Sequence, residues 1–340
     1  MARAVLPTLN AMQLPFPTDW TGVFGRAAPL AVEIGFGDGK FLHHLARQQP
    51  TWNVVGIERA HAPLTWTEKR LQRTGLSTVR LVYGEGLMAL HCLFQPEQVR
   101  AFHLNFSDPW HKKRHHARRL VTTELLHAIA SRLEPGGAVY IATDIEPYAQ
   151  QIDLALQATP GLANAYGAPF LREREPGFSQ TRYERKALAA GRIPFYFRYQ
   201  RTSTPIDHPP PVKLDETMPN AVIQTPLSLQ AIQDAFTPHI LRNGPRTVHY
   251  MELYRSTQYP SLLVDTFIDE PLFKQHLMLL IQERSGGEFV VRMAEVGLPR
   301  ATDGAHEAVN HLAEWLRTLH PKGQYRHQKV KTVLDGASEP

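Results

Sequence analysis

The sequence of 340 residues contains a single cysteine, Cys92, so no disulfide bond can form within the chain. One thiol and no disulfide are typical of a reducing compartment, and we expect a cytoplasmic protein. The N-terminal residues MARAVLPTLN lack the charged and apolar regions of a signal peptide. No apolar run approaches the ~18 residues that cross a bilayer, so we expect no membrane span. The chain also lacks internal repeats and low-complexity tracts.

Positive charge is concentrated rather than spread. The formal net charge is +5, and one segment, LNFSDPWHKKRHHARRL from Leu104 to Leu120, holds much of the excess. It begins like a buried strand, reaches Asp108, and turns at Pro109 and Trp110. A basic run follows, made of Lys112, Lys113, Arg114, Arg118 and Arg119, with His111, His115 and His116 among them.

An acid at a strand end, an aromatic side chain and clustered cations favour an anionic polymer that presents a base to an active site. The alternative is a solvated charged loop, the usual role of a charge run. Trp110 either packs under the turn or stacks on a base. We expect no metal here: His111 and His115 are four residues apart, but Lys112 replaces the glutamate of a zinc motif and the cations repel a dication.

The first part of the chain alternates strands and helices. β-rich runs lie at 30–34, 54–57, 78–83, 101–106 and 138–142, separated by helical patterns that include 64–73, 85–93 and 122–133. Strands spaced by helices in this way are typical of βαβ units. We therefore predict an α/β fold, a doubly wound and mostly parallel sheet, for a domain over residues 1–201.

The amino-acid composition of the chain changes after Arg201. Residues 202–226 are predicted to be an extended linker because they are rich in proline: Pro205, Pro209, Pro210, Pro211, Pro219 and Pro226. Residues 227–340 are predicted to form a small α+β domain of unknown role. Its expected helices are 227–236, 271–283 and 302–319, and its expected strands are 247–254, 261–268 and 288–293.

Glycines follow the first predicted strand in the pattern E-x-G-x-G-x-G, formed by Glu33, Gly35, Gly37 and Gly39. Glycines here let the backbone pass close to a ligand at a helix N-terminus. A dinucleotide fingerprint would need glycine at position 40, where this chain has Lys40. The pattern instead resembles the first motif of Rossmann-like S-adenosylmethionine-dependent methyltransferases.

Two further acids follow the next strands. Glu58 ends the second strand, where a carboxylate can accept the hydroxyls of a ribose, and Glu85 follows the third. With Glu33, they place three acids at the carboxyl edge of a parallel sheet, where ligands bind. A helix cap is the alternative for Glu85. The set predicts an adenosine-type cofactor, and acids suit the cationic sulfonium of S-adenosylmethionine.

Taken together, the motifs resemble the bacterial tRNA (guanine-N7-)-methyltransferase family, whose members are Rossmann-like and use S-adenosylmethionine. The matching segments are Glu33–Leu42 (EIGFGDGKFL), Val55–Ala60 (VGIERA), Asn105–Leu120 (NFSDPWHKKRHHARRL), Leu133–Ala149 (LEPGGAVYIATDIEPYA) and Thr181–Phe197 (TRYERKALAAGRIPFYF). Three departures are visible. Ser107 replaces a proline, Ala117 replaces a common lysine, and Glu85 replaces the more usual aspartate.

The resemblance implies a role for each matching residue. It implies cofactor contacts at Glu33, Glu58, Glu85 and Asp108. It implies tRNA or guanine contacts at Lys112, Asp144, Thr181, Arg182, Tyr183 and Glu184. It implies further RNA contacts at Arg114, His115, His116, Arg118 and Arg119. No counterpart in the family is apparent for residues 202–340.

N7 of guanine carries a lone pair and no hydrogen, so its methylation needs positioning and charge stabilisation rather than a general base. Asp108 is our first candidate for the carboxylate that positions the guanine and stabilises its charge, and Asp144 is the second. Asp144 has a structural alternative as the cap of the helix that begins near Pro147. Two other functions remain: a methyltransferase acting on another RNA, and an RNA-binding scaffold without catalysis.

Overall fold

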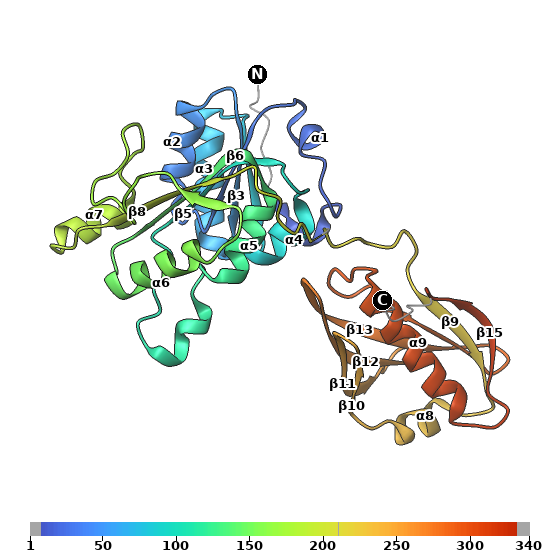
Figure 1. Cartoon of the computed structure of the whole chain (residues 1–340). Helices are drawn as coiled ribbons and strands as arrows, with labels where there is room; N and C mark the ends of the chain where they lie inside the picture. Colours follow the sequence, from blue (N-terminus) through green and yellow to red (C-terminus); the bar gives the residue numbers. More distant parts are fainter. Residues whose placement is uncertain (1–7, 210, 332–340) are drawn as a thin grey trace. The chain divides into compact units, whose positions relative to one another are not determined.

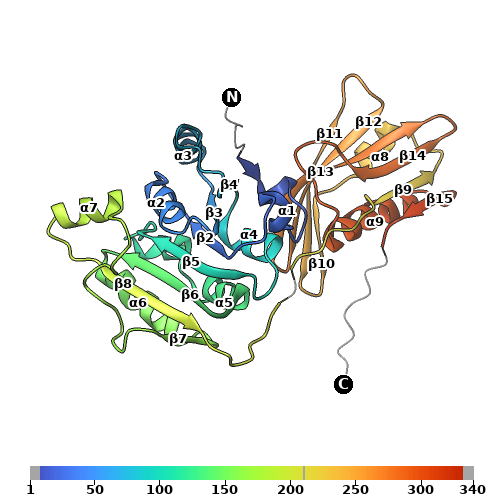
Figure 2. The ribbon, with the colours of Figure 1, turned by 90° about the horizontal axis from the view of Figure 1, so that it is seen from above.

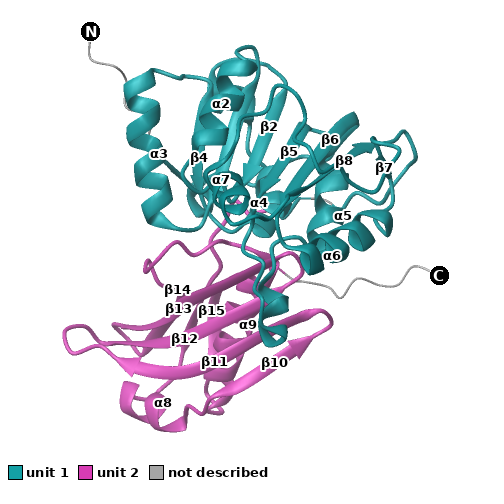
Figure 3. Ribbon diagram, turned by 90° about the vertical axis from the view of Figure 1, so that its left-hand side faces the viewer, with its two compact units in different colours: residues 1–212 teal, residues 213–340 magenta. Residues whose placement is uncertain are grey.

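The computed structural model describes residues 8–209 and 211–331. The chain forms two compact units, residues 1–212 and residues 213–340, coloured teal and magenta in Figure 3. No helix in the described ranges is long and apolar enough to cross a membrane.

The first unit is built on an eight-stranded sheet in the order β1-β4-β3-β2-β5-β6-β8-β7 (Figure 1). Its strands are β1 (Leu9–Asn10), β2 (Leu30–Ile34), β3 (Asn53–Glu58), β4 (Val79–Tyr83), β5 (Val99–Asn105), β6 (Leu133–Thr143), β7 (Leu162–Asn164) and β8 (Phe195–Arg201). Its helices are η1 (Ala11–Gln13), α1 (Trp20–Phe24), α2 (Lys40–Gln48), α3 (His61–Thr74), α4 (Gly86–Leu93), η2 (Lys113–Arg118), α5 (Thr123–Arg132), α6 (Glu146–Gln157) and α7 (Arg182–Ala189).

Six neighbouring strands of this sheet, β1 to β6, pair in parallel. All five residues of β2 are buried, as a strand covered on both faces requires. Side chains of α2 and α3 pack on one face of the sheet, while α4, α5 and α6 contact one another in turn on the other (Figure 2). The predicted doubly wound α/β fold is confirmed.

The sheet continues beyond the predicted strands. β8 pairs antiparallel with β6, and β7 pairs antiparallel with β8. β8 alternates buried and more exposed residues, with Phe195, Phe197 and Tyr199 facing inward. It follows α7, so the chain from 182 to 201 returns to the sheet edge beside β6.

The second unit is a seven-stranded antiparallel sheet in the order β10-β11-β12-β13-β14-β9-β15, with α9 packed across one face (Figure 1). Its elements are β9 (Asn220–Gln224), α8 (Leu229–Ala235), β10 (His239–Asn243), β11 (Arg246–Arg255), β12 (Ser261–Glu270), β13 (Phe273–Arg284), β14 (Glu288–Met293), α9 (Asp303–Thr318) and β15 (Gln324–Lys329). Ala305, Val309, Leu312 and Leu316 of α9 are fully buried against it. The predicted α+β appendage is confirmed.

One predicted helix of this unit is wrong. Residues 273–283 belong to β13, which pairs with β12 from Phe273 to Gln282. Phe273, Leu277, Leu279 and Ile281 are buried, at the period of two that a strand requires. The segment is rich in helix formers such as leucine, methionine and glutamine, and tertiary burial overrides that local preference.

The predicted linker at 202–226 differs from the structure at both ends. Residues 220–224 form β9, which lies between β14 and β15. At the other end, residues 202–212 are bound to the first unit. Thr202 N–H donates to Gly161 O (2.9 Å), Val212 N–H donates to His91 O (3.0 Å), and the buried Arg132 guanidinium donates to Pro209 O (3.0 Å).

This binding of residues 202–212 generates a prediction about the boundary. We expect a chain shortened to residues 1–212 to fold and to keep any function that the five matching segments carry. A chain ending at Arg201 removes the Pro209 acceptor of Arg132, and loss of a bond to a buried charge costs about 1.5–3 kcal/mol. Thermal unfolding of the two chains checks this: the shorter one should melt lower, by roughly 3 °C or more.

Equal melting temperatures would contradict the assigned boundary. If the 1–212 chain failed to fold while the full chain folded, the second unit would be part of the first unit's core.

Candidate active site

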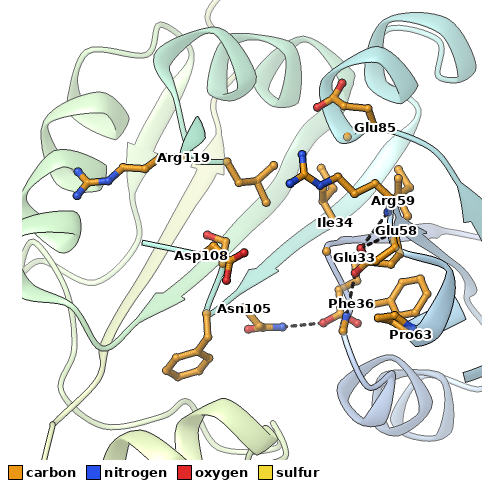
Figure 4. Close-up of a pocket in the computed structure, with 18 of the residues that line it drawn as sticks. Glu33, Ile34, Phe36, Glu58, Arg59, Pro63, Glu85, Asn105, Asp108 and Arg119 are labelled. Atoms are coloured by element: carbon orange, nitrogen blue, oxygen red, sulfur yellow. Dashed lines mark hydrogen bonds between the residues drawn. The ribbon is translucent and has the colours of Figure 1, made fainter. Parts of the chain in front are cut away.

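A cavity of about 760 Å³ opens at the carboxyl ends of β2, β3, β4 and β5 (Figure 4). Its volume lies in the range of small-molecule sites. The residues that the sequence selected at the four strand ends, Glu33, Glu58, Glu85 and Asp108, all line it. Figure 4 shows these carboxyl groups around one hollow. The parallel pairing of the strands thus brings together side chains up to 75 positions apart in the chain.

The glycine loop forms one wall of the cavity. Gly35, Gly37 and Gly39 have φ values of 73°, 54° and 65°, in the left-handed region that other residues avoid. Gly39 has a second constraint, since a Cβ atom there would overlap the Thr67 side chain of α3. The loop therefore turns into α2 while its backbone stays close to the cavity, as the motif predicted.

Glu33, on β2, is the most unusual acid of the site. Its side chain is buried, its Oε1 accepts from Asn105 Nδ2 (3.1 Å), and its Oε2 has no hydrogen-bond partner. Burial raises the pKa of Glu33 to about 8, against the opposing effect of the Asn105 hydrogen bond, with smaller contributions from Asp38 and Glu58. The carboxyl group is therefore mostly protonated at neutral pH when the cavity holds no cation.

Glu58 ends β3 and ties that strand to the glycine loop. Its Oε2 accepts from Gly37 N–H (3.3 Å), and its Oε1 accepts from the N–H groups of Arg59 (2.9 Å) and Ala60 (3.0 Å). These backbone donors fix the carboxylate at the entrance of α3. The position matches the one expected for an acid that binds ribose hydroxyls.

Glu85 is a helix cap as well as a lining residue. Its Oε1 accepts from Leu87 N–H (3.0 Å) and its Oε2 from Met88 N–H (2.7 Å), so it caps α4. The structural alternative that the sequence left open is therefore present. Since Glu85 also lines the cavity, capping holds its carboxylate at the cavity wall.

The turn after β5 is strained at both ends. Phe106 and Trp110 adopt φ values of 52° and 43°, which are uncommon for residues with a side chain and cluster at functional sites. Asp108 lies between them, exposed and lining the cavity. Ser107, the departure from the family's proline, forms a hydrogen bond of 3.2 Å with Tyr148 Oη.

The basic run forms the short helix η2 beside the turn. Lys112, Lys113, Arg114 and Arg118 are exposed, and the Arg118 guanidinium lies 5.1 Å from the centre of the Trp110 ring. The ring is half-buried, lines the cavity and meets His115 edge-on. The Trp110 ring therefore contacts Arg118 and His115 of its own loop and also lines the cavity.

Arg119, for which the resemblance implies an RNA contact, does not belong to this exposed set. Its side chain is buried, donates to Pro109 O (2.7 Å), bonds to Gln151 and His116, and covers the Tyr148 ring. Figure 4 shows it pointing away from the acids. Its donors hold the turn in shape, so they are not available to phosphates.

Glu184, for which the resemblance implies a substrate contact, has a structural role in α7. It is buried at the third position of α7, where Thr181 Oγ1 accepts from its N–H (3.0 Å) and its carboxylate accepts from Thr181 N–H (3.3 Å). It also pairs with Arg174. The T-x-x-E pattern is a capping box, a signal present in the sequence. Thr181, Arg182 and Tyr183 do line the cavity.

Asp144 lies apart from the main cavity lining and accepts from Arg192 Nε (2.7 Å). It does not cap α6, whose N-cap is Ile145, so the capping alternative is wrong. The structure also shows two residues that the sequence reasoning missed, Asn105 and Tyr148. Asn105 ends β5 and was visible within the matching segment, but nothing in the sequence shows that its partner is Glu33.

Within the described ranges, no group of three or more histidine, cysteine or acidic side chains is arranged to hold a metal ion. His115 and His116 are engaged with Arg114 and Arg119 respectively.

The comparisons with known proteins agree with this site. A family model described as "Putative methyltransferase" matches residues 27–196, half of the chain. The tRNA (guanine-N(7)-)-methyltransferase of Thermus thermophilus is 32% identical over 88% of this chain and 93% of its own length. This chain belongs to that family. The enzyme of the same name from Thermotoga maritima is 30% identical over 88% of this chain and 93% of its own length.

The relatives differ in how far they extend. Alignments over 88% of the chain must reach well into the second unit, because the first unit ends at residue 212. This corrects the expectation that residues 202–340 have no counterpart in the family. The relative from Geobacter metallireducens is 34% identical over 57% of this chain and 92% of its own length, so it does not carry both units.

The different surroundings of Arg118 and Arg119 generate a paired prediction. Arg118→Ala should lower the salt dependence of tRNA binding by about one phosphate contact and leave thermal stability unchanged, because the side chain is exposed. Arg119→Ala should instead lower the free energy of unfolding by about 1.5–3 kcal/mol, since it removes bonds from a buried charge. Binding at several salt concentrations and denaturant unfolding measure the two effects. The assignment is wrong if the two variants exchange behaviours.

Proposed function

We propose that this protein transfers the methyl group of S-adenosylmethionine to N7 of a guanine in the variable loop of tRNA. The observation that carries the proposal is the arrangement of acids from four strand ends around one cavity, directly beside an exposed cationic loop. The names of the relatives support the same activity.

The cavity residues fit S-adenosylmethionine. The free Oε2 of Glu33 is a buried acceptor without a partner, which suits a cationic group of the ligand. Glu58 would accept ribose hydroxyls, the glycine loop would lie along the ligand, and Glu85 would face the adenine side. The cofactor supplies a methyl group on a positively charged sulfur.

Catalysis then rests on position and charge. Guanine N7 is nucleophilic without losing a proton, so this chain needs no general base for the transfer. Asp108 is exposed at the cavity, where it would accept from the guanine N–H groups and stabilise the positive charge that the ring gains. Trp110 and Tyr183 would provide ring surfaces near the incoming base.

The RNA backbone would lie on the exposed cations of η2. Lys112, Arg114 and Arg118 are free of ion pairs with carboxylates in the described part of the chain, so their charge faces solvent. Each phosphate that they neutralise releases counterions and adds salt-dependent affinity. Thr181 and Arg182, at the start of α7, would meet the substrate from the opposite wall. Asp144 remains a proposed guanine contact and would first have to leave Arg192.

Methyl transfer to a tRNA pool tests the proposed reaction. A methyl-labelled donor should label tRNA, and borohydride reduction followed by aniline should cut the product at one guanine of the variable loop, because only N7-methylated guanine is sensitive to this treatment. Unlabelled tRNA from the same reaction without enzyme is the control. Label in another RNA class, or resistance to scission, would contradict the proposal.

Substitutions of two acids of the cavity should have different effects on the enzyme. Asp108→Ala should lower turnover by about 10²-fold or more while the melting temperature stays close to wild type, because the side chain is exposed and would act on the transition state. Glu58→Ala should chiefly weaken cofactor binding. Calorimetric titration with S-adenosylmethionine and steady-state kinetics separate the two. Near wild-type turnover of Asp108→Ala would remove it from the catalytic role, and Asp108→Asn shows how much depends on its charge.

A further inference from the structure

A second group of cations lies on α2 and α3, outside the motifs discussed so far. Trp66 projects from the middle of α3 with 56% of its surface exposed, an uncommon state for the largest side chain. Along the same stripe, at helical spacings of three and four, are Lys69, Arg70 and Arg73. Lys69 and Arg73 are exposed, and Arg70 is half-buried at the edge of the stripe.

α2 lies beside α3 in both views of the molecule (Figures 1 and 2). Arg47 is exposed near the end of α2, and His43, one turn earlier, is half-buried. Burial lowers the pKa of His43, and the nearby charges of Arg47 and Arg70 lower it further, so one cation from each helix lies near this ring. We call Arg47, Trp66, Lys69 and Arg70 the α2–α3 surface.

The acids nearest to this surface in the sequence have other partners. The one acid inside α3, Glu68, is on the opposite flank of the helix, half-buried, and accepts from Thr8 Oγ1 (3.1 Å). Asp38 pairs with Lys40 at 3.6 Å at the start of α2. In the described ranges, none of the carboxylate ion pairs that the structure forms involves Arg47, Lys69 or Arg70. Clustered cations outside ion pairs, next to an exposed indole, match an RNA surface better than a protein interface core, where charges are depleted.

The α2–α3 surface is continuous with the rim of the cavity. Asp38 and Phe41, at the start of α2, and Arg59 and Pro63, at the start of α3, line the cavity. From Pro63 to Arg73 the helix rises about 15 Å. An RNA that places one nucleotide in the cavity therefore reaches this stripe with neighbouring nucleotides or with its helical body.

We propose that the α2–α3 surface is a second RNA-binding site, which holds the body of the tRNA whose guanine enters the cavity. It rests on the proposed function for the identity of the RNA. Arg47, Lys69 and Arg70 contact phosphates, and the Trp66 ring stacks on an unpaired base or packs against a ribose. This site lies on α2 and α3, the helices that follow β2 and β3, whereas the basic run of η2 follows β5.

The double variant Arg47→Ala/Lys69→Ala tests the phosphate contacts in the full chain. Its affinity for whole tRNA, measured by fluorescence anisotropy at several salt concentrations, should show a salt slope lower by about two, one for each lost contact. The charge-conserving variant Arg47→Lys/Lys69→Arg should keep the wild-type slope. Melting temperature and affinity for S-adenosylmethionine should not change, since both side chains are exposed.

Trp66→Ala tests the ring. It should weaken tRNA binding by about tenfold, and Trp66→Phe should restore most of the loss, because phenylalanine also stacks. A short hairpin that carries only the target guanine and its loop should bind all these variants and wild type equally, since it does not extend along α3.

Several results would overturn the inference. An unchanged slope and affinity with whole tRNA would make the stripe a solvated face. An equal loss on hairpin and whole tRNA would place the effect at the cavity. A change in sedimentation with unchanged RNA affinity would make Trp66 a contact between copies of the chain. If wild-type protein binds tRNA without methylating it, the proposed function fails while the slope measurement still tests this site.

Discussion

The parallel pairing of β2 with its two neighbours is the constraint on which the site depends. Glu33 lies opposite Gly56 of β3 and His103 of β5, so the strands end at one edge and their last residues converge. Asn105 then reaches Glu33 across the edge, and Glu58 reaches back to the glycine loop. The proposed ligand contacts of Glu33, Glu58 and Asp108 follow from this register. The strained turn at Asp108 is held by hydrogen bonds to Tyr148 and Arg119.

Much of the first unit could be predicted because each strand there is a short apolar run and each tip carries a polar residue. The period of two in β8 went unnoticed, and β13 was misread because its residues favour a helix while its burial requires a strand. A local propensity is a weak guide when a central strand must be covered on one face. β9 was not predicted, because it has only five residues, too few for a clear alternation of apolar and polar side chains, and adjoins the proline-rich segment.

At the site, the sequence identified which residues gather but not what each one contacts. Arg119 has the same charge as Arg118. Only the fold shows that Arg119 is buried against the Tyr148 ring while Arg118 is exposed. Glu184 could have been recognised, because its capping box is local. The partner of Asp144 could not, since Arg192 lies 48 positions away. Cationic runs therefore overstate the charge that a nucleic acid can reach.

The protonated state of Glu33 gives the cavity a preference that changes with acidity. A neutral carboxyl group at this depth is stable only while no positive charge stands beside it, and a cationic ligand must displace its proton. Below pH 8 that displacement opposes cation binding, and the opposition weakens as the pH rises toward 8. A neutral ligand of the same shape binds without removing the proton of Glu33. The pocket therefore discriminates between charged and uncharged forms of a ligand most sharply in mildly alkaline solution, where the Glu33 carboxyl is already ionised. At lower pH, entry of the charged form releases a proton from the protein.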